Sequence, residues 1–356
     1  MFKRVLSLIV SPLLKLINNH LETIRADIIS LKQEILNFEN LLNDKNHRIT
    51  TIEKNLNENN NMILAITKRL NEVNHKAQFC NDKMLLINQR IPIVLTCFSL
   101  DLMRHVLGML SPLQVISHKK VRLGAEYDGG YVMVDSKIDN SIVYNFGVGD
   151  NASWDLELVS RGCVIHQYDH TIERTPILNP AIIFHKIGIS GINKKDNEMK
   201  TIDEVITDNG HHDSDSLIMN MDVEGCEWDI LKSVDHKILN KFHQIVIEFH
   251  NMFDISDHYR MKDITTVLEK LNITHCPVHV HANNCSRIGI ILGLPFPETI
   301  EVTYLRRADN LFEISNEIFP TKLDRPNNPE TEDYFLGMIG VAWKHPVCDS
   351  SSDRVG

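Results

Sequence analysis

From Lys119 onward, short apolar runs alternate with stretches that have the character of helices. The runs SIVYNF, CVIHQY, AIIFHK, LIMNM and QIVIEF are each about five or six residues long and rich in β-branched side chains. Such runs are typical of strands that are buried on both faces of a sheet. Their alternation with helices predicts an α/β fold with a mostly parallel sheet and helices on both faces.

The carboxyl ends of these strands indicate where a ligand would bind, because open parallel sheets hold ligands at that edge. Each end carries glycines or acidic side chains. In chain order the five ends are Gly147-Val148-Gly149-Asp150, Asp169, Ile187-Gly188-Ile189-Ser190, Asp222-Val223-Glu224-Gly225 and Glu248-Phe249-His250. Glycine lets a ligand approach the backbone closely. An acid about twenty residues after a glycine loop has the spacing that meets the hydroxyls of a ribose.

The strand end Gly147-Val148-Gly149-Asp150, here called the glycine corner, does not have the sequence of a dinucleotide-binding loop. A dinucleotide fingerprint needs a third glycine, where this chain has Ala152-Ser153, and Asp150 would place negative charge against a pyrophosphate. A cationic ligand without a pyrophosphate suits this acidic corner better. S-adenosylmethionine has a sulfonium, a ribose and an amino-acid tail, and it is therefore the predicted cofactor.

The motifs GVGDNASWD, MDVEGCEWDIL and VIEFH together resemble the FkbM-type S-adenosylmethionine-dependent methyltransferases, most closely their methyltransferase-like branch. The segments VRLGAEYDGGYVM, VHVHANNC and ETIEVTYLRR add to the resemblance, which spans roughly Lys119 to Trp343. It implies a class I methyltransferase fold, which is Rossmann-like with a mostly parallel seven-stranded sheet whose last hairpin is antiparallel. It also implies that the methyl group is usually transferred to a hydroxyl.

Carried onto this chain, the resemblance places Gly147 and Gly149 along the methionine part of the cofactor and Asp169 at its ribose. Ile187 and Gly188 would border the adenine. Asn145 opens the motif where many methyltransferases have an acid. This departure weakens the expected hold on the amino group of the cofactor, for which Asp150 is a substitute.

A hydroxyl acceptor must lose its proton during methyl transfer, and a carboxylate or histidine within hydrogen-bond reach is the natural base. Asp222, Glu224, Glu248 and His250 lie where that base must come from. Glu227 is expected on the surface of the following helix. Carboxylates with His250, His279 or His281 could hold a divalent metal ion, but the sequence does not predict one.

Residues 17–90 form a predicted coiled-coil stalk. Their apolar side chains recur in steps of three and four over about eight heptads, which gives two apolar positions in each heptad. These two seam positions would face a partner helix, and only Lys45 and Asn59 place a polar residue there. Isoleucine at both seam positions favours a homo-oligomer of three or more helices over a dimer. The alternative is a long single helix that folds against the body.

The stalk prediction can be tested on residues 1 to about 90 expressed alone, which should form a helical oligomer. Ile35 occupies a seam position, so Ile35→Asp should dissociate this oligomer, because burying an unpaired charge costs several kcal/mol. Analytical ultracentrifugation measures the mass of both forms, and a monomeric unaltered segment would contradict the prediction.

Around the stalk, the sequence predicts an amphipathic lead-in at 1–16, a helical connector at 91–118, a methyltransferase domain at 119–345 and a flexible tail at 346–356. The lead-in has no signal-peptide cleavage site and is too short to span a membrane, so only peripheral membrane contact is left open. Seven scattered cysteines favour a cytoplasmic location. A formal net charge of -10 argues against nucleic-acid binding.

Three functions remain open at this point. The first is an O-methyltransferase that acts on a glycan or another large hydroxylated acceptor. The second is a coiled-coil assembly protein whose methyltransferase-like body is catalytically inactive, which Asn145 favours. The third, a dehydrogenase, requires a nicotinamide cofactor to bind.

Overall fold

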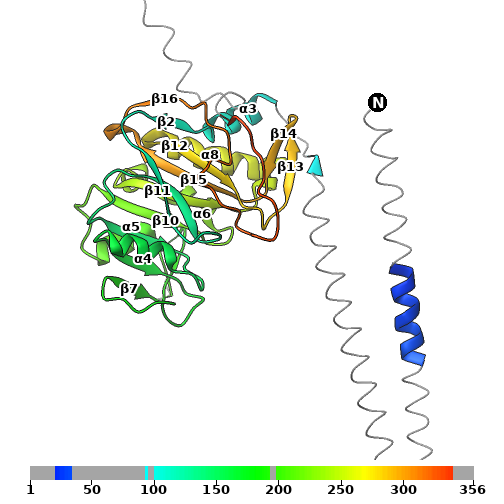
Figure 1. Cartoon of the computed structure of the whole chain (residues 1–356). Helices are drawn as coiled ribbons and strands as arrows, with labels where there is room; N and C mark the ends of the chain where they lie inside the picture. The colour runs from blue at the N-terminus through cyan, green and yellow to red at the C-terminus, as the bar shows by residue number, and fades with distance from the viewer. Residues whose placement is uncertain (1–20, 34–92, 95–99, 193–197, 340–356) are drawn as a thin grey trace, which may run out of the picture. The chain divides into compact units, whose positions relative to one another are not determined.

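The computed structural model describes residues 21–33, 93–94, 100–192 and 198–339 (Figure 1). The chain divides into two units, Met1–Lys83 and Met84–Gly356. In the first unit, residues 21–33 form a helix. The lead-in, the tail and the rest of the stalk lie outside the described residues, so the coiled coil and its oligomeric state stay predictions. None of the described helices is long and apolar enough to cross a membrane.

A seven-stranded sheet forms the centre of the second unit (Figure 1). Its order is β12-β15-β11-β10-β5-β6-β7, and only β15 runs antiparallel to its neighbours. The strands are β5 Ile142–Phe146, β6 Val164–Tyr168, β7 Ile182–His185, β10 Leu217–Met221, β11 Phe242–Phe249, β12 His275–Ala282 and β15 Ile300–Arg306. The five predicted strands are confirmed, and so is the mostly parallel seven-stranded sheet.

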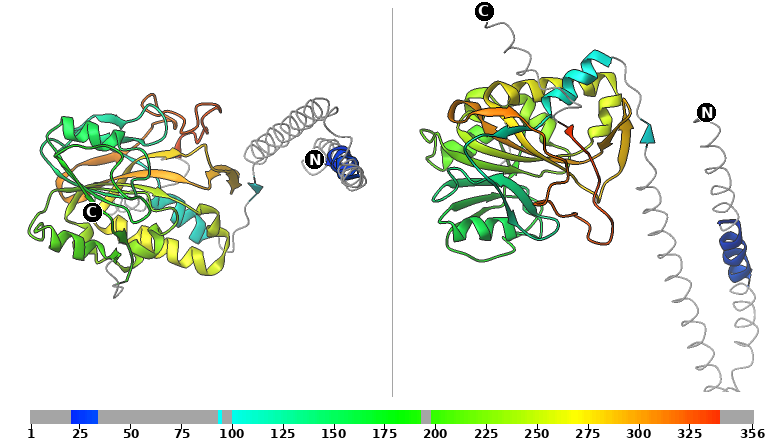
Figure 2. Two further views of the ribbon diagram at one scale, coloured as in Figure 1. Left: turned by 90° about the horizontal axis from the view of Figure 1, so that it is seen from below. Right: turned by 45° about the horizontal axis from the view of Figure 1, so that its top comes forward.

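Helices cover both faces of this sheet, as the alternation of strands and helices predicts (Figure 2). One face packs against α3 Leu100–Met109, α5 Ile202–Asp208, α6 Glu227–Ser233, α7 His236–Leu239 and α8 His258–Thr274. The other face packs against α4 Ser153–Ser160 and the hairpin of β3 Lys120–Gly124 with β4 Gly130–Val134. Successive side chains of a strand point to opposite faces, so Ile218 packs under α4 whereas Met219 packs on the other side.

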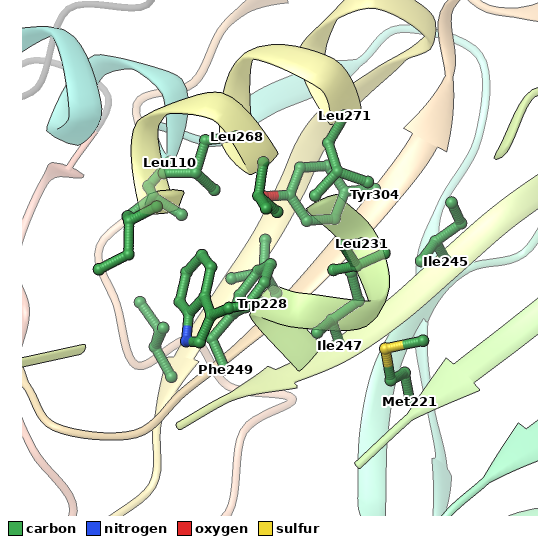
Figure 3. Packing of buried hydrophobic residues seen from close by; sticks show 14 of the residues in the cluster. Leu110, Met221, Trp228, Leu231, Ile245, Ile247, Phe249, Leu268, Leu271 and Tyr304 are labelled. Carbon is green, nitrogen blue, oxygen red and sulfur yellow. The ribbon is translucent and has the colours of Figure 1, made fainter. Parts of the chain in front are cut away.

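Aromatic packing fixes the loop between β10 and α6 against the end of β11 (Figure 3). Trp228 is buried and stacks on Phe249 with ring centroids 4.5 Å apart. Its indole Nε1 donates a hydrogen bond to the backbone oxygen of His250 at 2.8 Å. Leu231 of α6 and Leu268 of α8 belong to the same buried cluster. The carboxyl ends of two neighbouring strands are therefore held together by a rigid core.

The segment that was predicted as a helical connector contributes to this core. Met103, Val106 and Leu107 of α3 are buried in the main cluster, and β2 Leu113–Val115 pairs with β16 Phe312–Ile314. The compact body therefore includes residues before Lys119. The remaining elements are β1 Ile93–Val94, β8 Gly188–Ile189, β9 Met199–Lys200, β13 Ile288–Ile291, β14 Leu294–Pro297, and the 3-10 helices η2 Met252–Ser256 and η3 Arg307–Asp309.

Candidate active site

A pocket of about 550 Å³ lies at the carboxyl ends of β5, β6 and β10. Eight of the residues predicted for the site line it, namely Asn145, Gly147, Gly149, Asp150, Asp169, Gly188, Asp222 and Glu224. Ile187 does not line it, whereas Ile189, two residues further along the chain, does. Glu248 and His250 do not line it, but Nε2 of His250 lies close to Asp222 and Glu224, and Glu248 lies close to the same nitrogen.

The glycine corner has two glycines with different tasks. Gly147 has a φ of 81°, and a Cβ built on it would lie 1.6 Å from the backbone oxygen of Asp222. Only glycine therefore allows β5 and β10 to approach each other at this point. Gly149 has a φ of 57°, but nothing lies within 4 Å of a Cβ built on it. The open space beside Gly149 leaves its backbone accessible to a ligand.

Asp169 holds this corner in place. Its Oδ2 accepts hydrogen bonds from the backbone N–H groups of Val148 at 2.9 Å and Gly149 at 3.0 Å. Its Oδ1 accepts from the N–H and the hydroxyl of Thr171 at 2.7 and 2.6 Å. Burial alone would raise the pKa of Asp169, but the bonds from Thr171, Val148 and Gly149 outweigh it and lower that pKa. These four bonds use the acceptor capacity of a carboxylate, so a ribose hydroxyl would have to replace one of them.

Asn145 is tied to a carboxylate that the sequence reasoning missed. Its amide Nδ2 donates to both oxygens of the buried Asp155, at 3.0 and 2.9 Å. Its Oδ1 accepts from Nδ2 of Asn220 at 3.0 Å. Asp155 also lines the pocket, and burial raises its pKa to about 6. Asp155, in the first turn of α4, therefore places a carboxylate next to position 145, where the sequence lacks an acid.

Four carboxylates surround the imidazole of His250. Its Nε2 lies 3.9 Å from Oδ1 of Asp222, 3.4 Å from Oε2 of Glu224 and 3.7 Å from Oε1 of Glu248. Its Nδ1 lies 3.1 Å from Oε1 of Glu227. Two adjacent parallel strands, β10 and β11, deliver these residues from their carboxyl ends and the loops that follow.

The prediction that Glu227 lies on the surface is wrong. Glu227 is fully buried, and its Oε1 accepts from the backbone N–H groups of Val223 and Gly225 at 3.1 Å each. Its position at the start of α6 explains the error, because the first turn of this helix faces the loop that it follows. An acid there can satisfy the N–H groups of that loop.

Burial and mutual repulsion make this cluster hard to ionise fully. Burial raises the pKa of Asp222 to about 7, with His250 acting in the opposite direction and Glu224 and Glu227 adding to the rise. Burial and the charge of Asp222 raise the pKa of Glu248 well above its usual value. Burial alone would lower the pKa of His250, but the hydrogen bond and charge of Glu227 raise it. A carboxyl group that titrates near neutral pH can accept a proton from a bound hydroxyl.

The two other histidines considered as metal ligands lie elsewhere. Nε2 of His279 contacts Oδ1 of Asp324 at 2.7 Å, and the ring of His281 contacts Glu301 at 3.1 Å and Asp333 at 3.0 Å. All five side chains are mostly buried. Among the described residues, only Asp222, Glu224 and His250 have ligand atoms close enough together to share an ion.

The segment before β5 contributes Asp128, Gly129 and Tyr131 to the pocket. Tyr131 is buried and meets Trp154 edge to face, with ring centroids 6.2 Å apart. The side chain of Asp128 accepts from Nδ2 of Asn327 at 2.9 Å. Both Tyr131 and Asp128 line the pocket, so the segment DGGYV forms part of its wall.

Comparison with solved structures gives remote similarities. A Listeria monocytogenes protein with a provisional assignment as an S-adenosylmethionine-dependent methyltransferase is 11% identical, with a TM-score of 0.28 over 48% of this chain and 92% of that chain. A fibrillarin/Nop5p complex gives 12% identity and a TM-score of 0.29 over 55% and 97% of the two chains. The Methanococcus jannaschii fibrillarin pre-rRNA processing protein is 9% identical, with a TM-score of 0.28 over 55% of this chain and 87% of that chain.

No curated protein sequence matches the chain. The family model described as a methyltransferase domain does match, over residues 103–291. This match begins in α3 and ends with β13, so it includes the glycine corner, Asp169 and the carboxylates around His250. Because the match covers more than half of the 356 residues, this chain belongs to the methyltransferase-domain family.

Proposed function

We propose that this protein is an S-adenosylmethionine-dependent methyltransferase of the FkbM type that transfers a methyl group to a hydroxyl of a glycan or another large acceptor. The observation that carries the proposal is the acidic pocket at the carboxyl ends of β5, β6 and β10. It combines an accessible glycine backbone at Gly149 with carboxylates at Asp155 and Asp222. Its volume lies within the usual range for sites of cofactors and small molecules.

The lining of the pocket fits the parts of this cofactor. The carboxylate of Asp155 suits the cationic amino group, and the backbone of Gly149 can be approached by the methionine part. Gly188 and Ile189 offer a small and apolar border for the adenine. When bound, S-adenosylmethionine supplies a sulfonium whose methyl group is open to attack from the side opposite to the sulfur.

The protein mainly aligns the acceptor and excludes water during such a displacement. Asp222 lines the pocket, and its pKa of about 7 suits a group that takes the proton of the attacking hydroxyl. Glu224 lies at the exposed rim, whereas Glu248 and His250 lie behind Asp222. We therefore assign the role of base to Asp222, with the other three residues adjusting its charge and position.

The alternative is an assembly protein with an inactive body, and Asn145 is the residue that favours it. The hydrogen bonds from Asn145 to the buried Asp155 argue against an inactive body, because they place a carboxylate next to position 145, where the sequence lacks an acid. Titration calorimetry with S-adenosylmethionine separates the two functions. An inactive body need not bind the cofactor, whereas the proposed enzyme must bind one molecule per chain.

The acceptor can be identified by incubating the protein with cell extract and an isotope-labelled S-adenosylmethionine. Mass spectrometry then shows which molecule gains the label. Labelling of a hydroxylated glycan or another large acceptor supports the proposal. Cofactor binding without any labelled product, from extracts of the native organism, would favour the assembly protein.

Asp169→Ala should weaken the binding of S-adenosylmethionine by roughly tenfold to a hundredfold, because a charge-assisted hydrogen bond contributes about 1.5–3 kcal/mol. The change removes the two bonds to the backbone of the glycine corner and the two bonds to Thr171. Calorimetry measures the affinity, and thermal unfolding without ligand checks that the body stays folded. Asp213→Ala, at an exposed loop position, is the matched control. Unchanged affinity in Asp169→Ala would show that this acid does not support the cofactor.

A further inference from the structure

Four carboxyl groups share a single basic side chain in the cluster around His250. Asp222, Glu224, Glu248 and Glu227 all lie within 4 Å of this single imidazole. In the part of the chain that the structure describes, none of these carboxylates forms an ion pair with a lysine or an arginine. Close carboxylates of this kind require a proton or a cation between them.

The ring of His250 is oriented by a buried carboxylate. Glu227 is fully buried, is fixed by the N–H groups of Val223 and Gly225, and contacts Nδ1 of His250 at 3.1 Å. Glu227 can accept a proton from Nδ1, and this contact turns Nε2 towards the other three carboxylates. A carboxylate behind the far nitrogen is the arrangement that orients metal-binding histidines.

Asp222 has an oxygen that the protein itself does not satisfy. Its Oδ1 is buried and has no hydrogen-bond partner among the described residues, although it lies 3.9 Å from Nε2 of His250. An unsatisfied buried acceptor costs free energy, and native proteins rarely leave one without a reason. A cation between Oδ1 and Nε2 would satisfy both atoms.

We propose that Asp222, Glu224 and His250 bind one divalent cation. The ligand atoms of the first three residues all lie within 4.8 Å of one another. Three atoms bound to the same ion at about 2.2 Å lie roughly 3.1–3.8 Å apart. The distances of 3.9 and 3.4 Å from Nε2 of His250 to Asp222 and Glu224 are close to this range, and the two carboxylates must approach each other by at most about 1 Å. Carboxylate oxygens together with one imidazole suit a cation such as Mn²⁺.

The site lies in the wall of the pocket, because Asp222 and Glu224 both line it. A cation there would bind the oxygen of an incoming hydroxyl and lower the pKa of that hydroxyl. This role rests on the proposed function, whereas binding of the cation itself does not. The two can therefore be tested separately.

The test is a titration of Mn²⁺ into the purified full-length protein without S-adenosylmethionine. Electron paramagnetic resonance of the free ion, together with calorimetry, gives the stoichiometry and the affinity. We expect one ion per chain, with affinity lowered at least tenfold in Asp222→Asn and in His250→Gln. Glu224→Gln should also weaken binding, and it cannot disturb the core because 86% of the Glu224 side chain is exposed. Glu313→Gln, at an exposed position of β16, should bind as the unaltered protein does.

Absence of Mn²⁺ binding by the unaltered protein would overturn the site, as would equal binding by all variants. Titration with S-adenosylmethionine is the separate readout for the proposed function. A protein that binds Mn²⁺ but no S-adenosylmethionine retains the metal site and loses the methyltransferase proposal. The reverse result retains the methyltransferase proposal and removes the metal site.

Discussion

Gly147→Ala should destabilise the domain by about 2–5 kcal/mol and abolish binding of S-adenosylmethionine. The backbone at Gly147 has a φ of 81°, which costs alanine about 1–2 kcal/mol. The added Cβ would also lie 1.6 Å from the backbone oxygen of Asp222, so β5 and β10 must move apart or twist. Overpacking of this kind typically costs a further 1–3 kcal/mol. The displaced strand ends are the ones that hold Asp169 and Asp222 in the pocket.

Gly149→Ala is the matched control, two residues along the same corner. Its φ of 57° carries a similar backbone cost, but the added Cβ meets nothing within 4 Å. We expect about 1–2 kcal/mol of destabilisation without a steric term. Urea unfolding monitored by tryptophan fluorescence measures the difference between the two variants. Equal loss of stability in both would show that the approach of β5 to β10 is not the constraint.

Most of the sheet could be predicted because its strands are short, apolar and buried on both faces. LIMNM and QIVIEF became β10 and β11, and the side-chain alternation that places Ile218 and Met219 on opposite faces follows from strand geometry alone. The parallel direction of these strands predicted that the pocket lies at the edge of the sheet where their carboxyl ends meet. Local pattern therefore determines which strands form and where the pocket lies.

The pairing of side chains within the site could not be predicted in the same way. Asp155 and Asn145 lie ten residues apart, and their contact depends on the angle at which α4 leaves the corner. Glu227 was predicted to lie on the surface, because the sequence does not show that the N–H groups of Val223 and Gly225 point towards its side chain. Both contacts depend on tertiary geometry. An acid in the first turn of the following helix was the only local signal in each case.

The carboxylates proposed as candidates for the base show the same limit. Asp222, Glu224, Glu248 and His250 are the predicted candidates for the base, and their positions in the chain do not show how far each side chain is exposed in the pocket. The side chain of Glu224 is 86% exposed, whereas that of Asp222 is 30% exposed and that of Glu248 is 5% exposed. Only Asp222 combines a position in the pocket lining with substantial burial. The ranking therefore comes from the structure.

Asp222→Asn should lower turnover by about a hundredfold or more while leaving the affinity for S-adenosylmethionine largely unchanged. The amide keeps the size of the side chain but cannot accept the proton of the hydroxyl. Nor can it supply a charged oxygen to the cation that we propose between Asp222 and His250. Burial raises the pKa of Asp222 to about 7, so the group is matched to proton transfer near neutral pH. Transfer of labelled methyl to the identified acceptor measures turnover, and calorimetry measures the affinity.

Comparison of Glu224→Gln with Asp222→Asn separates cation binding from proton transfer. Glu224 is mostly exposed and is proposed to act only through the cation. The turnover of the Glu224→Gln variant should therefore be reduced at low Mn²⁺ and recover when Mn²⁺ is added in excess. The loss in Asp222→Asn should persist at every Mn²⁺ concentration, since the proton acceptor itself is gone. Treatment with a chelator should reduce turnover of the unaltered protein to the same extent as Glu224→Gln at low Mn²⁺. If both amide variants instead turn over at the unaltered rate, the base lies elsewhere, and His250 is the next residue to replace because its Nε2 faces the same carboxylates.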